Sequence, residues 1–212
     1  LVHRTKGDIY GVECLHKNAL EEYQKSKEHF DKAELSFHSA FALYNIATAY
    51  SDLRDYDNAI KYLLKSEEQF SENGYGLYQF ETQIELCYNY LQIDDFNSCA
   101  NVFARIDKSA KIGYSYCDYY CIYAILSAHS GNFVDAKTYI SKAKTEQIIN
   151  PMQLAYSEYA IKTLKGDLGD ALISYKNMIA LQDISVFNAI NNSLLQSQVD
   201  LLSATCCDSF FE

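Results

Sequence analysis

Residues 40–71 read AFALYNIATAYSDLRDYDNAIKYLLKSEEQFS, and this stretch decides the fold. Apolar or small residues recur in its first half at helical spacing, at Leu43, Ile46, Ala47 and Tyr50. The polar run Asp55-Tyr56-Asp57 interrupts that pattern, and a second helical pattern follows at Ala59, Ile60, Leu63 and Leu64. The stretch therefore predicts two helices joined by a short polar turn.

The same arrangement recurs along the chain. A small residue occupies the same place in each second helix, at Ala19, Ala59, Cys99, Ala136 and Ala171, with steps of 40, 40, 37 and 35 residues. Antiparallel helices approach closely only where the facing side chains are small, so these positions are expected at helix crossings. One hairpin cannot bury its apolar face alone, whereas five stacked hairpins can.

The pattern resembles the tetratricopeptide repeat (TPR), in which a large residue, a small residue and a tyrosine on the first helix precede an alanine on the second. Residues 40–71 supply these as Leu43, Ile46-Ala47, Tyr50 and Ala59, while Ser71 replaces the closing proline of the family. The resemblance implies an all-α fold, a right-handed α-α superhelix of five hairpins and a C-terminal capping helix, forming one domain over residues 1–212.

The expected hairpins cover residues 1–34, 36–72, 75–111, 113–147 and 151–181. A final helix over 185–209 would cover the open end of the stack with Phe187, Ile190, Leu194, Leu201 and Leu202. Turn residues agree with these bounds, at Gly74-Tyr75-Gly76, Gly131-Asn132 and Lys165-Gly166-Asp167. Asn150-Pro151 predicts a helix start, with Asn as the cap and Pro in the first turn.

Composition narrows the class of function. A formal net charge of −10 argues against nucleic acid and anionic membrane surfaces as partners, because both require a basic face. No apolar run of 18 or more residues is present, so no membrane segment is expected. The chain has none of the common nucleotide-binding or nucleophile motifs, so we expect neither an enzyme nor a cofactor. The compartment stays open, as the cytoplasmic or periplasmic part of a larger protein.

In proteins of the resembled family the first helix of each hairpin lines a ligand groove. Positions not used for packing are therefore expected in that groove: Arg4, Asp8 and Gly11 in the first copy, Phe41, Tyr44, Asn45 and Thr48 in the second, Glu81, Ile84, Glu85 and Tyr88 in the third, and Asp118, Cys121, Ile122 and Ile125 in the fourth. Chaperone-binding relatives use cations there to hold a terminal carboxylate, whereas this lining is acidic and aromatic. A basic or aromatic-rich protein or peptide fits it better, although plain solvated helix surface is the alternative reading.

The seven cysteines are scattered over the predicted helices. Cys117 and Cys121 share a helix face, but zinc normally takes four ligands, so packed thiols are expected and no metal. Cys87 and Cys99 occupy facing small positions of the third hairpin, where they serve as small apolar residues or form a disulfide.

The function that follows is a non-catalytic scaffold that binds a protein or peptide. High Tyr, Asn and Lys usage and long repeats look similar to TPR regions of regulatory or sensor proteins of Bacteroides-like bacteria. The alternative is a regulator of the peptide-pheromone receptor type without its effector segment. The exposed apolar end of the first hairpin also makes a homodimer an expectation.

Overall fold

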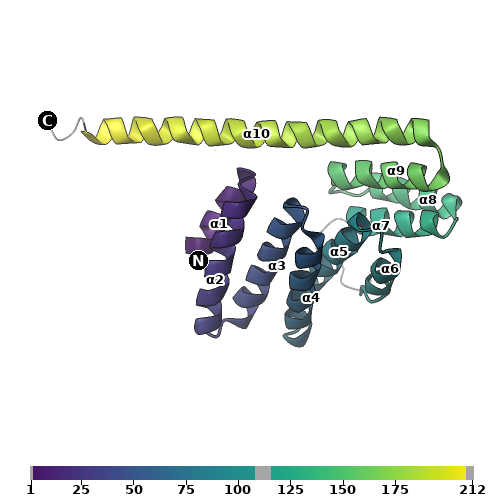
Figure 1. Cartoon of the computed structure of the whole chain (residues 1–212), viewed down its shortest axis with the longest axis horizontal. Helices are drawn as coiled ribbons and strands as arrows, with labels where there is room; N and C mark the ends of the chain where they lie inside the picture. The colour runs from purple at the N-terminus through teal and green to yellow at the C-terminus, as the bar shows by residue number, and fades with distance from the viewer. Residues whose placement is uncertain (1, 108–115, 209–212) are drawn as a thin grey trace.

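The computed structural model describes residues 2–107 and 116–208, with side chains as far as residue 189 and at residue 191. Within this part the chain forms ten α-helices and no strand (Figure 1). The helices are α1 (Val2–Val12), α2 (His16–Lys32), α3 (Ser36–Asp52), α4 (Tyr56–Glu72), α5 (Gly76–Gln92), α6 (Phe96–Ala104), α7 (Tyr116–His129), α8 (Phe133–Lys144), α9 (Pro151–Lys165) and α10 (Leu168–Asp208).

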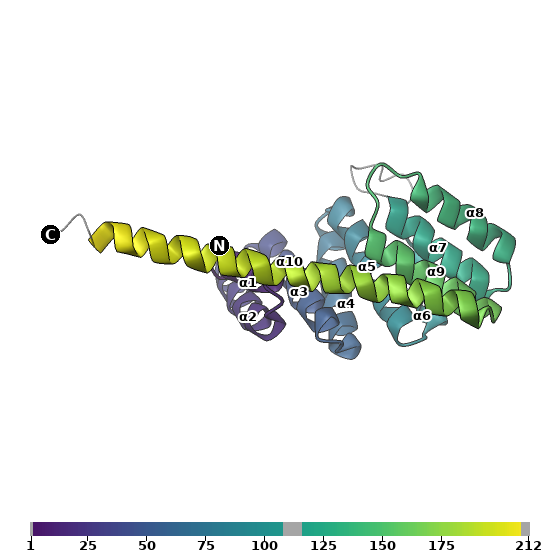
Figure 2. The same cartoon turned by 90° about the horizontal axis from the view of Figure 1, so that it is seen from above.

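Successive helices pack in antiparallel pairs, and each pair stacks on the next. The hairpins α1/α2, α3/α4, α5/α6 and α7/α8 follow one another along the array, and α9 packs against both α7 and α10 (Figures 1 and 2). This confirms the all-α solenoid of TPR-like helical hairpins. The largest core cluster spans α3 to α9, because each hairpin buries its apolar face only against its neighbours.

The helices of a pair cross at the small residues that the repeat places there. Ala19, Ala59, Cys99, Ala136 and Ala171 are all buried, none being more than 4% exposed. In the first hairpin the facing residue is Gly7, and a Cβ atom there would lie 2.5 Å from Cε1 of Tyr23. A larger side chain at such a crossing would force the two helices apart.

The turns between helices repeat every 20 residues along the first half of the chain. A residue with positive φ ends each helix, at Cys14, Glu34, Arg54, Gly74 and Asp94. The N–H of the next residue then donates to the carbonyl oxygen five residues earlier, as Leu35 does to Phe30. This closure satisfies carbonyl groups that the helix end leaves free. The 20-residue spacing explains the 40-residue steps between hairpins.

Side-chain caps begin several of the later helices. Asp55, Asp95, Asn132 and Asn150 each accept a hydrogen bond from the backbone N–H three residues on. Asn150 receives that bond from Gln153 at 3.3 Å, and Pro151 is the first residue of α9, so the predicted helix start is confirmed.

A buried carboxylate joins the second hairpin to the third. Glu67 on α4 is 6% exposed, and its Oε1 accepts a hydrogen bond from Nε2 of Gln83 on α5 at 2.8 Å. Its Oε2 lies 3.1 Å from an Nη atom of Arg105, just after α6. Because a buried charge without partners is unfavourable, this pairing favours one register between the two hairpins.

The expected separate helix over 185–209 is wrong. Residues 168–208 form one continuous helix, α10, that runs back along the array beyond the α9 pairing (Figures 1 and 2). No Gly or Pro follows Gly169, so nothing in the sequence ends the helix near residue 182. Phe187 is 64% exposed and covers no open end, while the side chains of Ile190, Leu194, Leu201 and Leu202 lie outside the described residues.

The positive-φ turns give a stability test. Glu34 is exposed and has φ of 55°, a conformation that glycine adopts more easily than other residues. We expect Glu34→Gly to raise the free energy of unfolding by about 0.5–1 kcal/mol, measured by urea denaturation. Gly74→Ala, at φ of 72°, should lower it by a similar amount. Destabilisation by Glu34→Gly would contradict this account of the turns.

Candidate functional site

A cavity of about 410 Å³ opens between the first helices of the second, third and fourth hairpins. Its lining combines apolar and acidic side chains, from α3, α5, α7 and the segment before α9: Tyr44, Phe80, Glu81, Ile84, Glu85, Asp118, Ile148 and Asn150. We call this cavity the acidic pocket. It brings together five of the predicted groove residues of the three hairpins, namely Tyr44, Glu81, Ile84, Glu85 and Asp118.

Three carboxyl groups line the acidic pocket, those of Glu81, Glu85 and Asp118. Glu81 and Glu85 are one helical turn apart on α5, so they share a face. Among the described residues, no Lys, Arg or His forms an ion pair with either of them or with Asp118. The described lining of the pocket thus brings three carboxyl groups together in a partly desolvated place.

Desolvation governs the protonation of these groups. Burial raises the pKa of Glu85 to about 7, with further increases from the charges of Asp118, Asp52 and Glu81 in that order. Burial also raises the pKa of Glu81. Burial thus disfavours the ionised forms of these carboxyl groups, and a positive charge placed beside them would favour ionisation.

Asp118 is held in place at the back of the acidic pocket. The hydroxyl of Tyr88 donates to Oδ1 of Asp118 at 3.4 Å, and the side chain of Asn150 also hydrogen bonds to this carboxylate. Burial raises the pKa of Asp118, and these two hydrogen bonds partly oppose that rise. Asn150 thus serves both as the cap of α9 and as a partner of the pocket carboxylate.

Aromatic rings extend from the acidic pocket along α3 and α5. The ring of Phe41 lies 6.0 Å from Tyr44 and 5.7 Å from Tyr78. The guanidinium carbon of Arg4 lies 4.5 Å above the centroid of Phe41. The chain therefore already places one cation on this aromatic surface, which is the geometry of a cation–π contact.

Several predicted groove residues lie elsewhere. Tyr88 and Asn45 are buried, at 4% and 7% exposure, and Cys121, Ile122 and Ile125 are fully buried in the core. Thr48 donates to the backbone carbonyl of Asn45 at 2.9 Å. Asp8 accepts a hydrogen bond from the Tyr23 hydroxyl at 3.0 Å, within the first hairpin. The expectation that all non-packing positions share one groove is therefore wrong for the five buried residues, because neighbouring helices cover them, whereas for Asp8 and Thr48 it stays a prediction.

Three lining residues escaped the sequence reasoning. Phe80 precedes Glu81 and is one turn before Ile84, so helical periodicity could have found it. Ile148 and Asn150 belong to the connection between α8 and α9. Their approach to α5 and α7 depends on how the fourth and fifth hairpins stack, which local sequence does not reveal.

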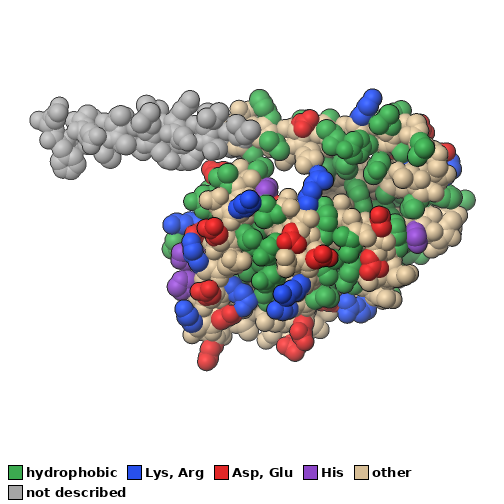
Figure 3. All heavy atoms as spheres, viewed as in Figure 1, with side chains coloured by type: hydrophobic (Ala, Val, Ile, Leu, Met, Phe, Trp, Pro, Cys, Tyr) green, Lys and Arg blue, Asp and Glu red, His purple; other side chains and the backbone are tan. Residues whose placement is uncertain are grey.

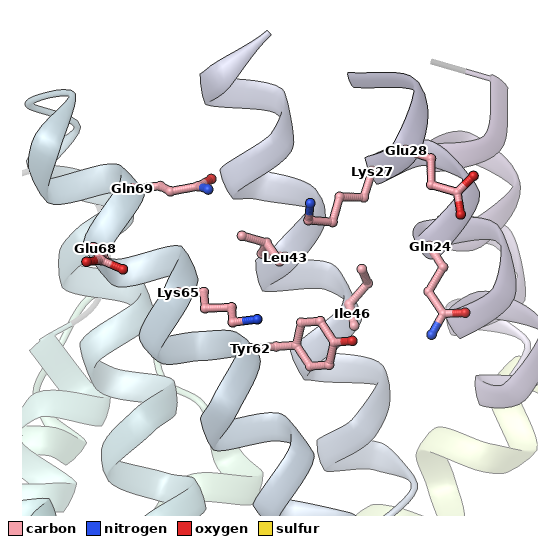
Figure 4. A pocket seen from close by; sticks show the side chains of 9 residues that line it. All are labelled: Gln24, Lys27, Glu28, Leu43, Ile46, Tyr62, Lys65, Glu68 and Gln69. Carbon is pink, nitrogen blue, oxygen red and sulfur yellow. The ribbon is translucent and has the colours of Figure 1, made fainter. Parts of the chain in front are cut away.

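A larger cavity of about 640 Å³ lies between α2 and α4, the second helices of the first two hairpins (Figure 4). Leu43 and Ile46 of α3 form part of its wall, and the other lining side chains come from α2 and α4. Lys27 pairs with Asp31, and Lys65 lies 5.8 Å from the Tyr62 ring centroid. Both charge signs line this groove, so it shows no preference for one kind of ligand.

The thiols behave as packing groups. Cys87, Cys99, Cys117 and Cys121 are free and fully buried, and Sγ of Cys87 lies 3.7 Å from the backbone oxygen of Cys99. Among the described His, Cys, Asp and Glu side chains, no group of three or more is arranged to hold a metal ion, the pocket carboxylates included. None of the described helices combines the length and apolarity that crossing a bilayer requires.

Comparison with solved structures supports the fold. The apo form of RapI superimposes with a TM-score of 0.62 at 18% identity, over 79% of this chain and 47% of RapI. A putative kinesin light chain from Podosopora anserina with nearly identical TPR-like repeats gives a TM-score of 0.59 at 13% identity, over 85% of this chain and 93% of that protein. No protein-family model and no curated protein matches the chain.

These neighbours are TPR-like helical repeats, so the fold expected from residues 40–71 is confirmed. The chain spans about half the length of RapI. At such low identity the likeness concerns the fold alone.

The raised pKa of Glu85 makes stability depend on pH. Between about pH 4.5 and 7 the folded protein keeps a proton that the unfolded chain has lost, so stability should fall as pH rises through this window. We expect Glu85→Gln to raise the free energy of unfolding at pH 8 by on the order of 1–3 kcal/mol and to have little effect at pH 4.5. Urea denaturation at both pH values measures this. The exposed Glu68→Gln is the control, and equal effects of Glu85→Gln at both pH values would contradict the assignment.

Proposed function

We propose that this chain is a non-catalytic scaffold that binds a protein or peptide segment in the acidic pocket. The segment carries a cationic side chain, Arg or Lys, next to an aromatic or apolar one. The observation that supports this most directly is the group of three partly desolvated carboxylates, Glu81, Glu85 and Asp118, without a cationic partner among the described residues.

The chemistry of the lining fits such a segment. A cation entering the pocket would contact the carboxylates, while Phe80, Ile84 and Ile148 would pack against its aliphatic stem or an adjacent side chain. Arg4 on Phe41 shows the contact that a neighbouring basic residue of the ligand would make on the aromatic surface. The net charge of −10 adds long-range attraction for a basic partner.

The chain is proposed as the repeat region of a larger bacterial regulatory or sensor protein. The support is the composition and the long repeat steps noted above, together with the TPR-like fold. The second candidate, a peptide-pheromone receptor-type regulator, would use the same pocket for a short free peptide. Short peptides that bind as tightly as the same sequence within a folded protein favour that candidate.

Peptide binding tests the scaffold proposal. In a panel of short peptides of equal length, those with an Arg-Phe pair should bind, and matched peptides with Glu-Phe should not, as measured by isothermal titration calorimetry. The double substitution Glu81→Lys and Glu85→Lys should weaken binding about 100-fold, because it replaces attraction by repulsion in a partly desolvated site. The double substitution Glu81→Gln and Glu85→Gln keeps the shape of the side chains but removes their charge. It should therefore weaken peptide binding by a smaller factor.

The matched control is Glu28→Lys with Glu68→Lys. These glutamates are exposed and line the larger cavity, so the change in net charge is equal but the acidic pocket is untouched. The affinity of this control variant for the Arg-Phe peptide should fall only slightly. If both double variants lose the same affinity, the loss comes from the change in net charge, and binding in the acidic pocket is contradicted.

A further inference from the structure

Helix α10 carries a row of exposed side chains that nothing in the described structure covers. Its buried residues near the start, Ala171 and Ser174, face α9, where Lys162 donates to Ser174 at 2.8 Å. Away from that contact, hydrophobic, acidic and basic side chains project from the described part of the helix (Figure 3). Leu172 is 53% exposed and Phe187 is 64% exposed, and apolar side chains that gather on one exposed surface mark an interaction site.

Five residues form one stripe along α10. Leu172, Lys176, Ile179, Asp183 and Phe187 follow one another at steps of three or four residues, so they share a helix face. Ala180 lies beside this stripe near its middle. Lys176 and Asp183 are exposed, and neither forms an ion pair with another described residue.

The stripe is chemically symmetric about the midpoint between Ile179 and Ala180. Leu172 and Phe187 are equidistant from that midpoint and are both large and apolar, and Lys176 and Asp183 are equidistant and opposite in charge. In a two-fold symmetric, antiparallel pair of helices, each residue meets its counterpart across the axis. Leu172 of one copy would then meet Phe187 of the other, and Lys176 would meet Asp183.

We propose that α10 is a self-association surface whose occupant is α10 of a second copy of this chain, packed antiparallel across a two-fold axis. Each dimer contains two Leu172–Phe187 contacts and two Lys176–Asp183 ion pairs. Ala180 lies at the axis, where its small side chain lets the two helices approach closely. The self-complementary order of apolar and charged residues favours a second copy over an unrelated partner, which would not require this symmetry.

Sedimentation velocity of the 212-residue chain over a wide concentration range provides the first test. The wild-type chain should dimerise reversibly. Phe187→Asp should weaken the dimer about 100-fold, because it removes two apolar contacts from the interface. The control is Ser185→Asp, at an exposed position on the side of α10 opposite the stripe, and it should dimerise like wild type. A wild-type chain that stays monomeric throughout overturns the proposal, and so does equal weakening by the two substitutions.

Charge exchange gives a sharper test of the antiparallel pairing. Lys176→Asp places Asp opposite Asp183, and Asp183→Lys places Lys opposite Lys176, so each variant alone should dimerise about tenfold more weakly than wild type. Mixing the two variants should restore association as a heterodimer, because both ion pairs then form, one with the wild-type arrangement of charges and one with the charges exchanged. Mixed samples that associate no better than either variant alone overturn the pairing. Circular dichroism confirms that every variant keeps its helices, and peptide binding in the acidic pocket provides an independent readout of folding.

Discussion

Close contact between antiparallel helices at small side chains is the constraint on which the rest of this structure depends. Ala19, Ala59, Cys99 and Ala136 let each second helix lie against its first helix, and Gly7 shows how little room the crossing leaves. Because each hairpin is thin, its other apolar surfaces are free to pack on the next hairpin. That stacking places α3, α5 and α7 side by side, so residues from three hairpins reach one cavity. The pocket is therefore a product of the repeat and not of any single helix.

The two carboxyl groups of Glu67 and Glu85 lie in different electrostatic surroundings in this chain. Glu67 is buried between hairpins and has Gln83 and Arg105 as partners, so it contributes to the register of the stack. Glu85 lies on the next helix, is desolvated enough for its pKa to reach about 7, and has no cationic partner among the described residues. Ionising such a buried carboxyl group costs stability, which is why the proposed function gives this pocket a cationic ligand. Asp118 and Glu81, facing the same cavity, strengthen that reasoning.

The fold could be predicted well from the sequence, because the repeat pattern depends on residues that lie close together along the chain. The small residues, the polar turns and the cap at Asn150 each act within one hairpin, and the hairpin bounds follow from them. The pocket was only partly predictable. Tyr44, Glu81, Glu85 and Asp118 followed from helical spacing, whereas Ile148 and Asn150 reach the cavity through the stacking of distant hairpins. The end of the chain was predicted incorrectly, since the hairpin over 151–181 and the helix over 185–209 were expected as separate elements although no helix-breaking residue stands between them.

Helix α9 connects the two surfaces proposed to bind partners. Its first turn begins at the cap Asn150, which hydrogen bonds to Asp118 in the acidic pocket. Its later turns hold α10 through the bond from Lys162 to Ser174 and the contact of Tyr159 with Tyr175, whose centroids are 5.5 Å apart. A ligand in the pocket and a second copy on α10 would thus act on opposite ends of one rigid helix. Any influence of the first on the second must be matched by an equal influence in return, because coupling between two binding equilibria is reciprocal.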